Sequence, residues 1–311
     1  MHKVTGRWRL GLLLSLITAF CWGVLPIALK VMLERMDPAT ITWYRVLVAS
    51  SVTALVLAMR GGLPKLAETT RRSWLVLAVC LVGLTGNWVL YVAALRYTTP
   101  GVNQTVVQLS PLFLLIGGVF IYKEPFSRWQ WLGFTSLVGG LVLFFNRRLP
   151  ELMDIRGGLG LGVILVLCSS LLWATYALAQ KTLLKRMTSP QILLMLYVGA
   201  TIVVLPFARL GDIRTLDPLR AGVLAFCCVN TLVGYGAFAE ALDHWEVSRV
   251  SAVIAIAPIF TFLGMRLTSY FVPGLLEPEP LTALTIAGAL IVITGSALSA
   301  LGQRRLPELN A

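Results

Sequence analysis

The chain has 311 residues, of which 57% are hydrophobic and 13% are charged, and its formal net charge is +12. This composition excludes an ordinary soluble domain, because several apolar runs are long enough to span a lipid bilayer. The basic residues are scattered among the loops and form no single stripe, which argues against a nucleic-acid partner.

The apolar runs predict an all-α membrane protein with about ten transmembrane helices. The longest connections between them, residues 60–72, 147–156 and 210–219, are too short for a separate soluble domain. Whatever the protein does is therefore expected to happen within the bilayer. In chain order, the predicted spans are residues 9–31, 39–59, 73–95, 101–121, 129–146, 158–180, 189–209, 220–242, 248–267 and 281–302.

The positions of lysine and arginine predict how these helices are oriented. In the first half, most basic residues fall in loops on the same side as the N-terminus, which the positive-inside rule assigns to the cytoplasm. The second half shows no clear bias. Because an even number of spans returns the chain to its starting side, both the N-terminus and the C-terminus are expected in the cytoplasm.

The two halves of the sequence resemble each other. Residues 22–36 align with residues 173–187 at an offset of 151, and later spans align at offsets of 147 and 155. We therefore divide the chain into a first five-helix repeat, residues 1–150, and a second, residues 151–311. Because five is an odd number, the second repeat must enter the membrane from the opposite face. The sequence thus predicts two inverted repeats, related by a pseudo-two-fold axis in the membrane plane.

Glycines recur in the last span of each half. Gly133 and Gly140 are seven residues apart, as are Gly288 and Gly295. This spacing puts each pair on one side of its helix, where small residues let helices approach closely. We expect this contact within one chain, with a dimer contact as the alternative, so the protein is expected to be a monomer or a homodimer.

Two prolines are predicted to act as hinges. Pro111 and Pro258 lie near the middle of the fourth and ninth spans, at aligned positions of the two halves. A proline inside a helix costs about 3 kcal/mol and frees the carbonyl four residues earlier, here those of Val107 and Ile254. In a membrane that carbonyl needs a partner or a water-filled cavity. A kink repaired by neighbouring helices is the alternative interpretation.

Polar and aromatic residues within the spans are the candidates for binding a substrate. An amide exposed to lipid is costly, so such side chains should face the interior, where aromatic rings and a few amides can hold a small solute. Helix packing and interhelical hydrogen bonding are the alternative roles. The candidate substrate-binding residues are Trp22, Asn87, Tyr91, Asn103, Gln104, Gln108, Trp173, Tyr176, Gln180, Asn230 and Tyr235.

Few charged residues fall inside the spans. Arg45 lies about two turns into the second span, where a carboxylate-binding or gating role competes with anchoring by a side chain that reaches the membrane surface. Glu240 lies in the last turn of the eighth span and is a candidate proton carrier, with a solvated cap as the alternative. Since no carboxylate is predicted at the middle of the membrane, facilitated export or exchange is favoured, and proton coupling stays open.

Five short sequence features are spread along the first half. They are the Trp22-Gly23 pair, Arg45, the Ala94-Leu95 pair, the Ser110-Pro111 pair and Glu124 at the start of the fifth span. Together they resemble the EamA family of the drug/metabolite transporter superfamily, and the resemblance covers nearly the whole chain, twice. In the second half Ala174 replaces the glycine and Ala257 replaces the serine, which weakens any claim of equivalent sites.

The resemblance implies a carrier of five plus five helices in a bacterial inner membrane. Such carriers move amino acids or other small metabolites, often outward, and we expect alternating access between the two repeats. The implied partners are a small-molecule substrate and the lipid bilayer, and no cofactor or metal is expected. The identity of the substrate does not follow from the residues.

Two other functions compete with this interpretation. A lipid or lipid-precursor flippase of the same superfamily would need a side opening wide enough for acyl chains. A membrane-embedded enzyme is the more remote alternative, because the only histidines, His2 and His244, lie outside the apolar cores. A serine and a histidine therefore cannot meet within the membrane.

Overall fold

The computed structural model describes residues 5–65, 70–122, 127–152, 158–276 and 282–301. Throughout these ranges the regular structure is helical, and nine helices or helix pairs are long and apolar enough to cross a membrane. The chain is therefore a multi-pass membrane protein. The nine are α1 (Trp8–Met32), α2 (Pro38–Met59), α3 (Arg71–Ala94), α4 (Pro100–Val106) with α5 (Ser110–Tyr122), α8 (Leu159–Leu183), α9 (Ser189–Val204), α10 (Pro218–His244), α11 (Val247–Ile254) with α12 (Ala257–Phe271), and α13 (Ala283–Leu301).

The fifth predicted span corresponds to α6 (Arg128–Phe144), which has 17 residues. The shortest of the nine spans have 19 residues, and they are α13 and Ser189–Phe207, which is α9 together with the 3₁₀ turn Leu205–Phe207. A single turn, α7 (Leu149–Leu152), follows it. Glu124, which the resemblance puts at the start of this span, lies outside the described residues. A total of ten spans stays a prediction.

Side-chain caps set where several helices begin. Asp37 precedes Pro38 at the start of α2, and its carboxylate accepts a hydrogen bond from the N–H of Thr40 at 3.0 Å. Thr99 and Pro100 begin α4 in the same way. Such a cap satisfies an N–H group that has no partner inside the helix, and proline fits the first turn because it has no N–H to lose. Short local patterns therefore determine these boundaries.

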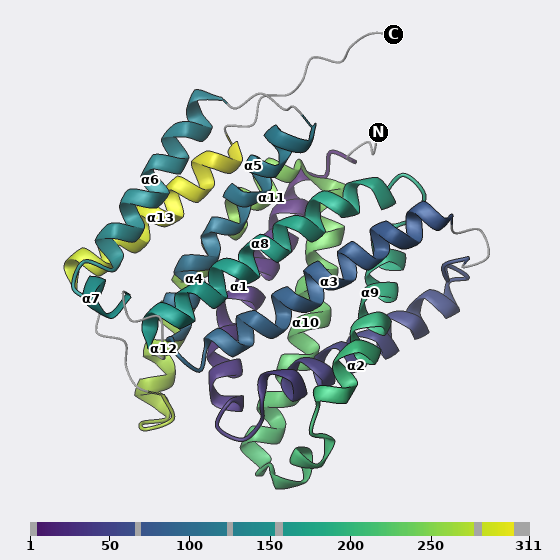
Figure 1. The fold of residues 1–311 in the computed structure, drawn as a ribbon, viewed down its shortest axis with the longest axis horizontal. Helices are drawn as coiled ribbons and strands as arrows, with labels where there is room; N and C mark the ends of the chain where they lie inside the picture. Colours follow the sequence, from purple (N-terminus) through teal and green to yellow (C-terminus); the bar gives the residue numbers. More distant parts are fainter. Residues whose placement is uncertain (1–4, 66–69, 123–126, 153–157, 277–281, 302–311) are drawn as a thin grey trace.

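The helices form one bundle in which segments of the two halves lie side by side (Figure 1). Helices α6 and α13 lie together along one edge, and α2 and α9 lie together at the other. Between these edges, α3 packs against α8 and α1 packs against α10. Each of these four pairings joins a helix of the first half to a helix of the second, so the core belongs to both halves.

Glycines set the close contact between α6 and α13. A Cβ atom on Gly140 would lie 2.9 Å from the carbonyl oxygen of Gly288, and one on Gly295 would lie 2.8 Å from that of Gly133. Only glycine permits backbones to approach so closely. Because Gly140 faces Gly288 and Gly133 faces Gly295, the two helices run antiparallel. The contact lies within one chain.

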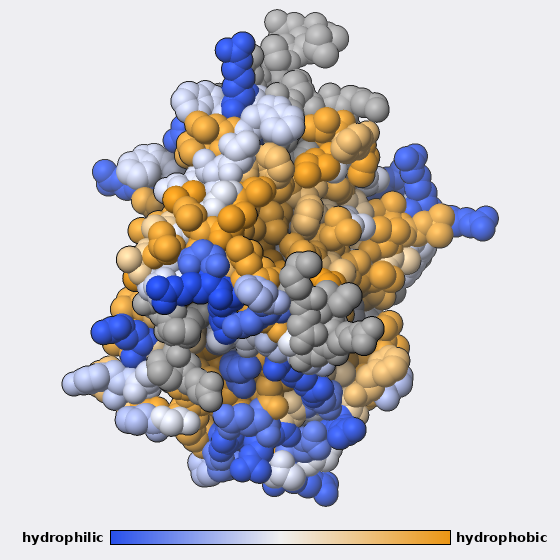
Figure 2. Space-filling model, turned by 60° about the vertical axis from the view of Figure 1, so that its left-hand side comes forward, coloured by the Kyte–Doolittle hydropathy of each residue, from blue (hydrophilic) through white to orange (hydrophobic). Residues whose placement is uncertain are grey.

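Large apolar side chains are exposed over much of the surface. Phe120, Val82 and Ile202 are 73%, 67% and 66% exposed. Figure 2 shows hydrophobic residues over much of one face, with hydrophilic residues gathered mainly toward its lower part. A soluble protein rarely exposes so large an apolar surface, whereas a multi-pass membrane protein presents it to lipid.

Candidate functional site

A cavity of about 160 Å³ lies inside the bundle. Trp22 and Trp173, which align with each other in the sequence, reach it from just beyond the middle of the 25-residue helices α1 and α8. Both halves of the chain therefore line it. The lining residues are Trp22, Leu25, Arg45, Asn87, Trp88, Tyr91, Gln104, Val107, Gln108, Ser110, Pro111, Trp173, Tyr235, Phe238, Ser251, Ile254 and Ala255.

The span formed by α4 and α5 is broken beside the cavity. Between the two helices, residues 107–109 form a 3₁₀ turn. The N–H of Ser110 donates to the carbonyl of Val107, which is the carbonyl that Pro111 was predicted to free. The turn thus gives this carbonyl a partner within the span, and Pro111 lines the cavity directly after the break.

The span formed by α11 and α12 has a matching break. The two helices are separated by two residues, and Pro258 lies in the first turn of α12. The N–H of Ile259 donates to the carbonyl of Ile256 at 2.9 Å, whereas a regular α-helix would pair it with Ala255. The carbonyl of Ala255 is therefore available to another partner.

Gln108 links the two breaks. Its Nε2 donates to the carbonyl of Ala255 at 2.6 Å, and its Oε1 accepts a hydrogen bond from the hydroxyl of Ser296 on α13 at 3.3 Å. A side chain of one half thus satisfies a backbone group that the break has freed in the other half. Gln108 and Ala255 are 147 residues apart, which equals the offset that aligns these two spans in the sequence.

Aromatic rings form one wall of the cavity. The ring centroid of Trp22 lies 5.4 Å from those of both Tyr235 and Phe238. Trp88 donates its indole N–H to the hydroxyl of Tyr235 at 2.7 Å, and it stacks on Tyr197 with centroids 5.5 Å apart. The rings hold one another in place and present a surface suited to an apolar or aromatic solute.

The amides beside these rings are partly used in contacts between helices. Tyr91 donates its hydroxyl to Oε1 of Gln104 at 2.8 Å, and Asn87 donates to the carbonyl of Ser169 on α8 at 3.0 Å. Among the described residues, Nε2 of Gln104 has no hydrogen-bond partner. Gln104 therefore keeps a donor for a bound molecule, while Asn87 fastens α3 to α8.

Arg45 is the one charged residue in the described lining of the cavity. Its side chain is only 3% exposed, and its Nε donates to the hydroxyl of Thr231 on α10 at 2.9 Å. The side chain therefore points into the bundle, and it does not reach toward the membrane surface as an anchoring role would require.

Two of the predicted amides lie outside the lining. Asn103 is fully buried, and its Nδ2 donates to the carbonyl of Tyr91 at 3.0 Å, which fastens the turn between α3 and α4. Asn230 donates to the carbonyl of Cys21 at 2.9 Å and so joins α10 to α1. In both cases the side chain serves contacts between helices.

Three further predicted residues lie away from the cavity. Tyr176 and Gln180 follow Trp173 along α8, and Tyr176 is buried against α3 and α9. Glu240 is 59% exposed, and its carboxylate lies 3.2 Å from Nε2 of His244 at the surface. Helical spacing indicates which face a residue occupies, but it does not indicate how far along the helix a cavity extends.

Some lining residues were not predicted, although the repeat pointed to them. Ser251 and Ala255 lie 147 residues after Gln104 and Gln108, at aligned positions. Their small side chains carry little binding chemistry of their own. Trp88 also lines the cavity and was not predicted. A ring that lines a cavity and a ring that only packs between helices look the same in a sequence.

The model of a known protein family matches the chain twice, over residues 9–146 and 160–301, and it describes the EamA-like transporter family. The chain belongs to the EamA-like transporter family. This confirms the resemblance that the Trp22-Gly23 pair and Arg45 helped to indicate. The chain is therefore a membrane transporter, and each half carries one EamA-like match.

Bacterial relatives of this EamA-like chain are named as transporters. It is 41% identical over 304 residues to an uncharacterized transporter of Haemophilus influenzae, covering 97% of this chain and 98% of that protein. It is 42% identical over 296 residues to the uncharacterized inner membrane transporter YhbE of Escherichia coli K12, covering 95% of this chain and 92% of that protein. A probable amino-acid metabolite efflux pump of Salmonella typhimurium is 23% identical over 304 residues, covering 94% of this chain and 95% of that protein.

A solved crystal structure has the same fold at low sequence identity. It covers 96% of this EamA-like chain and 99% of its own chain, with a TM-score of 0.63 and 15% identity. The likeness therefore covers both halves of the bundle.

Proposed function

We propose that this EamA-like transporter exports amino acids or other small organic metabolites across the inner membrane by alternating access. The observation that carries the proposal is the hydrogen bond from Gln108 to Ala255, which joins the broken spans of the two halves beside a shared cavity. Broken helices around a central site are common in transporters that rock one repeat against the other. The name of the Salmonella typhimurium relative, a probable amino-acid metabolite efflux pump, supports the substrate class and the direction.

Two inverted repeats, residues 1–150 and 151–311, are part of this proposal. The antiparallel crossing of α6 and α13 supports the inversion, because the sequence aligns these two helices with each other. The main pairings also persist when each helix is exchanged for its aligned counterpart. The pair α1 and α10 then becomes the pair α8 and α3, and both pairs are packed in the structure.

In this architecture α6 is a tenth membrane span. Its 17 residues extend about 26 Å at 1.5 Å per residue, which is close to the hydrocarbon thickness of about 30 Å. Helix α1 begins and α13 ends at the same end of the bundle (Figure 1), which an even number of spans requires. The charge bias of the first half then puts both chain ends in the cytoplasm. One chain supplies the described cavity, so a monomer would suffice for transport.

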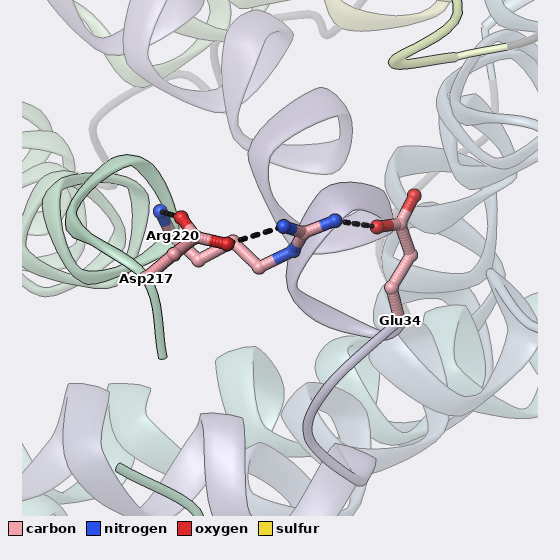
Figure 3. A network of polar contacts seen from close by, with 3 residues as sticks. All are labelled: Glu34, Asp217 and Arg220. Carbon is pink, nitrogen blue, oxygen red and sulfur yellow. Dashed lines mark hydrogen bonds and ion pairs between the residues drawn. The ribbon is translucent and has the colours of Figure 1, made fainter. Parts of the chain in front are cut away.

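An ion-pair network joins α1 to α10 at the opposite end of the bundle (Figure 3). Arg220 pairs with Glu34, which lies two residues after the last residue of α1, and with Asp217 at 2.5 Å. We call Glu34, Asp217 and Arg220 the latch. If the N-terminus is cytoplasmic, the latch lies on the periplasmic side.

A packed apolar layer separates the latch from the cavity. Leu29 and Met32 of α1 lie with Leu224 and Cys227 of α10 in one buried cluster. Along α10, this layer comes after the latch and before the cavity residue Tyr235. A solute that leaves the cavity at this end must pass both. Alternating access therefore requires α1 and α10 to separate there.

The Asp217 carboxylate of the latch is expected to stay charged at physiological pH. The backbone N–H and the guanidinium of Arg220 both donate to the carboxylate of Asp217, which lowers the pKa of Asp217 below its ordinary value. A group with a depressed pKa contributes to stability above its unfolded-state pKa, and this contribution is lost as the pH falls through the folded-state pKa. Asp217→Asn keeps the helix cap but removes the charge.

We therefore expect Asp217→Asn to lower the Tm of the purified protein by the same small amount at pH 7 and at pH 5. Thermal unfolding in detergent, followed by tryptophan fluorescence, measures this difference. A difference that is already smaller at pH 5 than at pH 7 would show that the carboxylate is protonated there, against the lowered pKa.

The cavity supports a small solute and facilitated transport. Its volume of about 160 Å³ resembles that of cavities that hold a benzene-sized molecule, which favours a small metabolite over a lipid. Among the described lining residues there is no carboxylate, and Glu240 lies at the surface. We therefore propose facilitated export or exchange in preference to proton-driven transport.

Transport in proteoliposomes, with a panel of amino acids and aromatic metabolites, tests the proposed function. Trp22→Ala removes the ring that contacts Tyr235 and Phe238. We expect KM to rise about twofold to twelvefold, for a loss of about 0.5–1.5 kcal/mol. Gln108→Ala leaves the freed carbonyl of Ala255 without its partner and should lower the maximal rate.

Trp129→Ala is the matched control, because Trp129 is 62% exposed on α6 and lies outside the cavity lining. It should transport like the wild type. Unaltered transport by both Trp22→Ala and Gln108→Ala would contradict the cavity as the binding site. A wild-type protein that transports no member of the panel would contradict the substrate class.

A further inference from the structure

Arg45 carries a buried positive charge that is not balanced within the cavity. An arginine side chain carries a permanent positive charge. Thr231 occupies its Nε, and among the described residues the two Nη nitrogens have no hydrogen-bond partner and no carboxylate pairs with the group. Burying such a charge is costly unless an anion pairs with it. The described lining supplies no anion.

Thr231 holds the guanidinium in a defined orientation. Its hydroxyl accepts the hydrogen bond from Nε and donates its own proton to the carbonyl of Cys227 at 2.8 Å. The bond fixes one edge of the planar group and leaves the Nη edge for another partner. A guanidinium edge matches a carboxylate, which can accept two parallel hydrogen bonds. A second donor, Nε2 of Gln104, lines the same cavity.

We propose that the substrates of this transporter are organic carboxylates whose carboxylate group binds Arg45. The apolar or aromatic body of the substrate lies against Trp22, Tyr235 and Phe238, which line the same cavity. This inference rests on the proposed transport function and names the chemical class that the cavity selects. An organic cation of the same size finds no counter-charge in the described lining and is repelled by Arg45.

A matched series of ligands tests the inference. We would use 3-phenylpropanoate, phenylalanine, phenylalanine amide and 2-phenylethylamine, which share one aromatic body and differ in the carboxylate. Binding is measured by ligand-induced thermal shift of the purified protein, and transport by counterflow in proteoliposomes. The two carboxylates should bind at least about a hundredfold more tightly than the amide and the amine, because a site built for a polar group rejects analogues that lack it.

Variants of Arg45 connect this preference to the guanidinium. Arg45→Gln should abolish it, and Arg45→Lys should keep part of it, because lysine retains the charge without the planar fork. Arg60→Gln is the control, because Arg60 is an exposed residue at the end of the same helix. It should keep the full preference.

The possible results separate the inference from the proposed function. A wild-type protein that transports the amide and the amine as well as the carboxylates would refute the inference and leave transport intact. An Arg45→Gln protein that folds and keeps the preference would also refute it. If Arg45→Gln does not fold, the preference of the wild type alone decides. Failure of the wild type to transport any solute would remove the proposed function itself.

Discussion

Replacing Gly140 with leucine should destabilise the folded protein by about 3 kcal/mol, whereas Gly139→Leu should change its stability little. A Cβ atom on Gly140 would lie 2.8 Å from the backbone nitrogen of Val292 and 2.9 Å from the carbonyl oxygen of Gly288. These are backbone atoms, so they cannot move aside unless α6 and α13 separate. Around a Cβ atom on Gly139, nothing lies within 4 Å.

Thermal unfolding of the two variants in detergent measures this difference. Gly139 and Gly140 are neighbours on one helix, so the gain in helix propensity is the same for both. A large decrease in Tm for Gly140→Leu alone would locate the cost in the contact between the helices. Equal Tm values would show that α6 and α13 do not cross at these glycines.

Cross-linking the latch should abolish transport. Cysteines replace Glu34 and Arg220, in a variant whose native cysteines have been removed and which still transports, and a cleavable bismaleimide then joins α1 to α10. Alternating access requires these helix ends to part, so the linked protein should be held in one state. Counterflow in proteoliposomes should fall to background and should recover when the linker is cleaved.

Single-cysteine variants treated with the same reagent control for modification itself. E34C and R220C alone should keep most of their transport, because ion pairs between partly exposed side chains contribute little to stability. Full transport by the linked protein would mean that α1 and α10 stay together during the cycle. The proposal would then need a different exit for the solute.

Local chemistry made much of the fold predictable. The Asp37-Pro38 and Thr99-Pro100 pairs mark helix starts, since cap and proline act within a few residues of each other. Pro111 and Pro258 were expected to act as hinges near the middle of their spans, and the structure has a break beside each of them. Their action as hinges stays a prediction. The glycine spacing likewise indicated a close helix contact, but not that α6 would meet α13.

The candidate site was less predictable, as neighbouring residues show. Asn103 and Gln104 are adjacent and similar in chemistry, yet Asn103 fastens the turn between α3 and α4 while Gln104 lines the cavity. Trp173 lines the cavity, whereas Tyr176, on the next turn of the same helix, is packed against α3 and α9. Periodicity could not separate these cases, because each pair lies within one helix.

The sequence by itself determined that this chain is a helical membrane transporter of the EamA-like family, where most helices begin and which two of its spans contain a central proline. These properties depend on apolar length, capping residues and proline, which act over a few turns. Only the tertiary structure decided that Gln108 bonds Ala255 and that Arg45 faces a cavity without a described acidic partner. The physical reason is that the cavity is formed where helices far apart in the sequence cross, and the position of that crossing is set by packing between them.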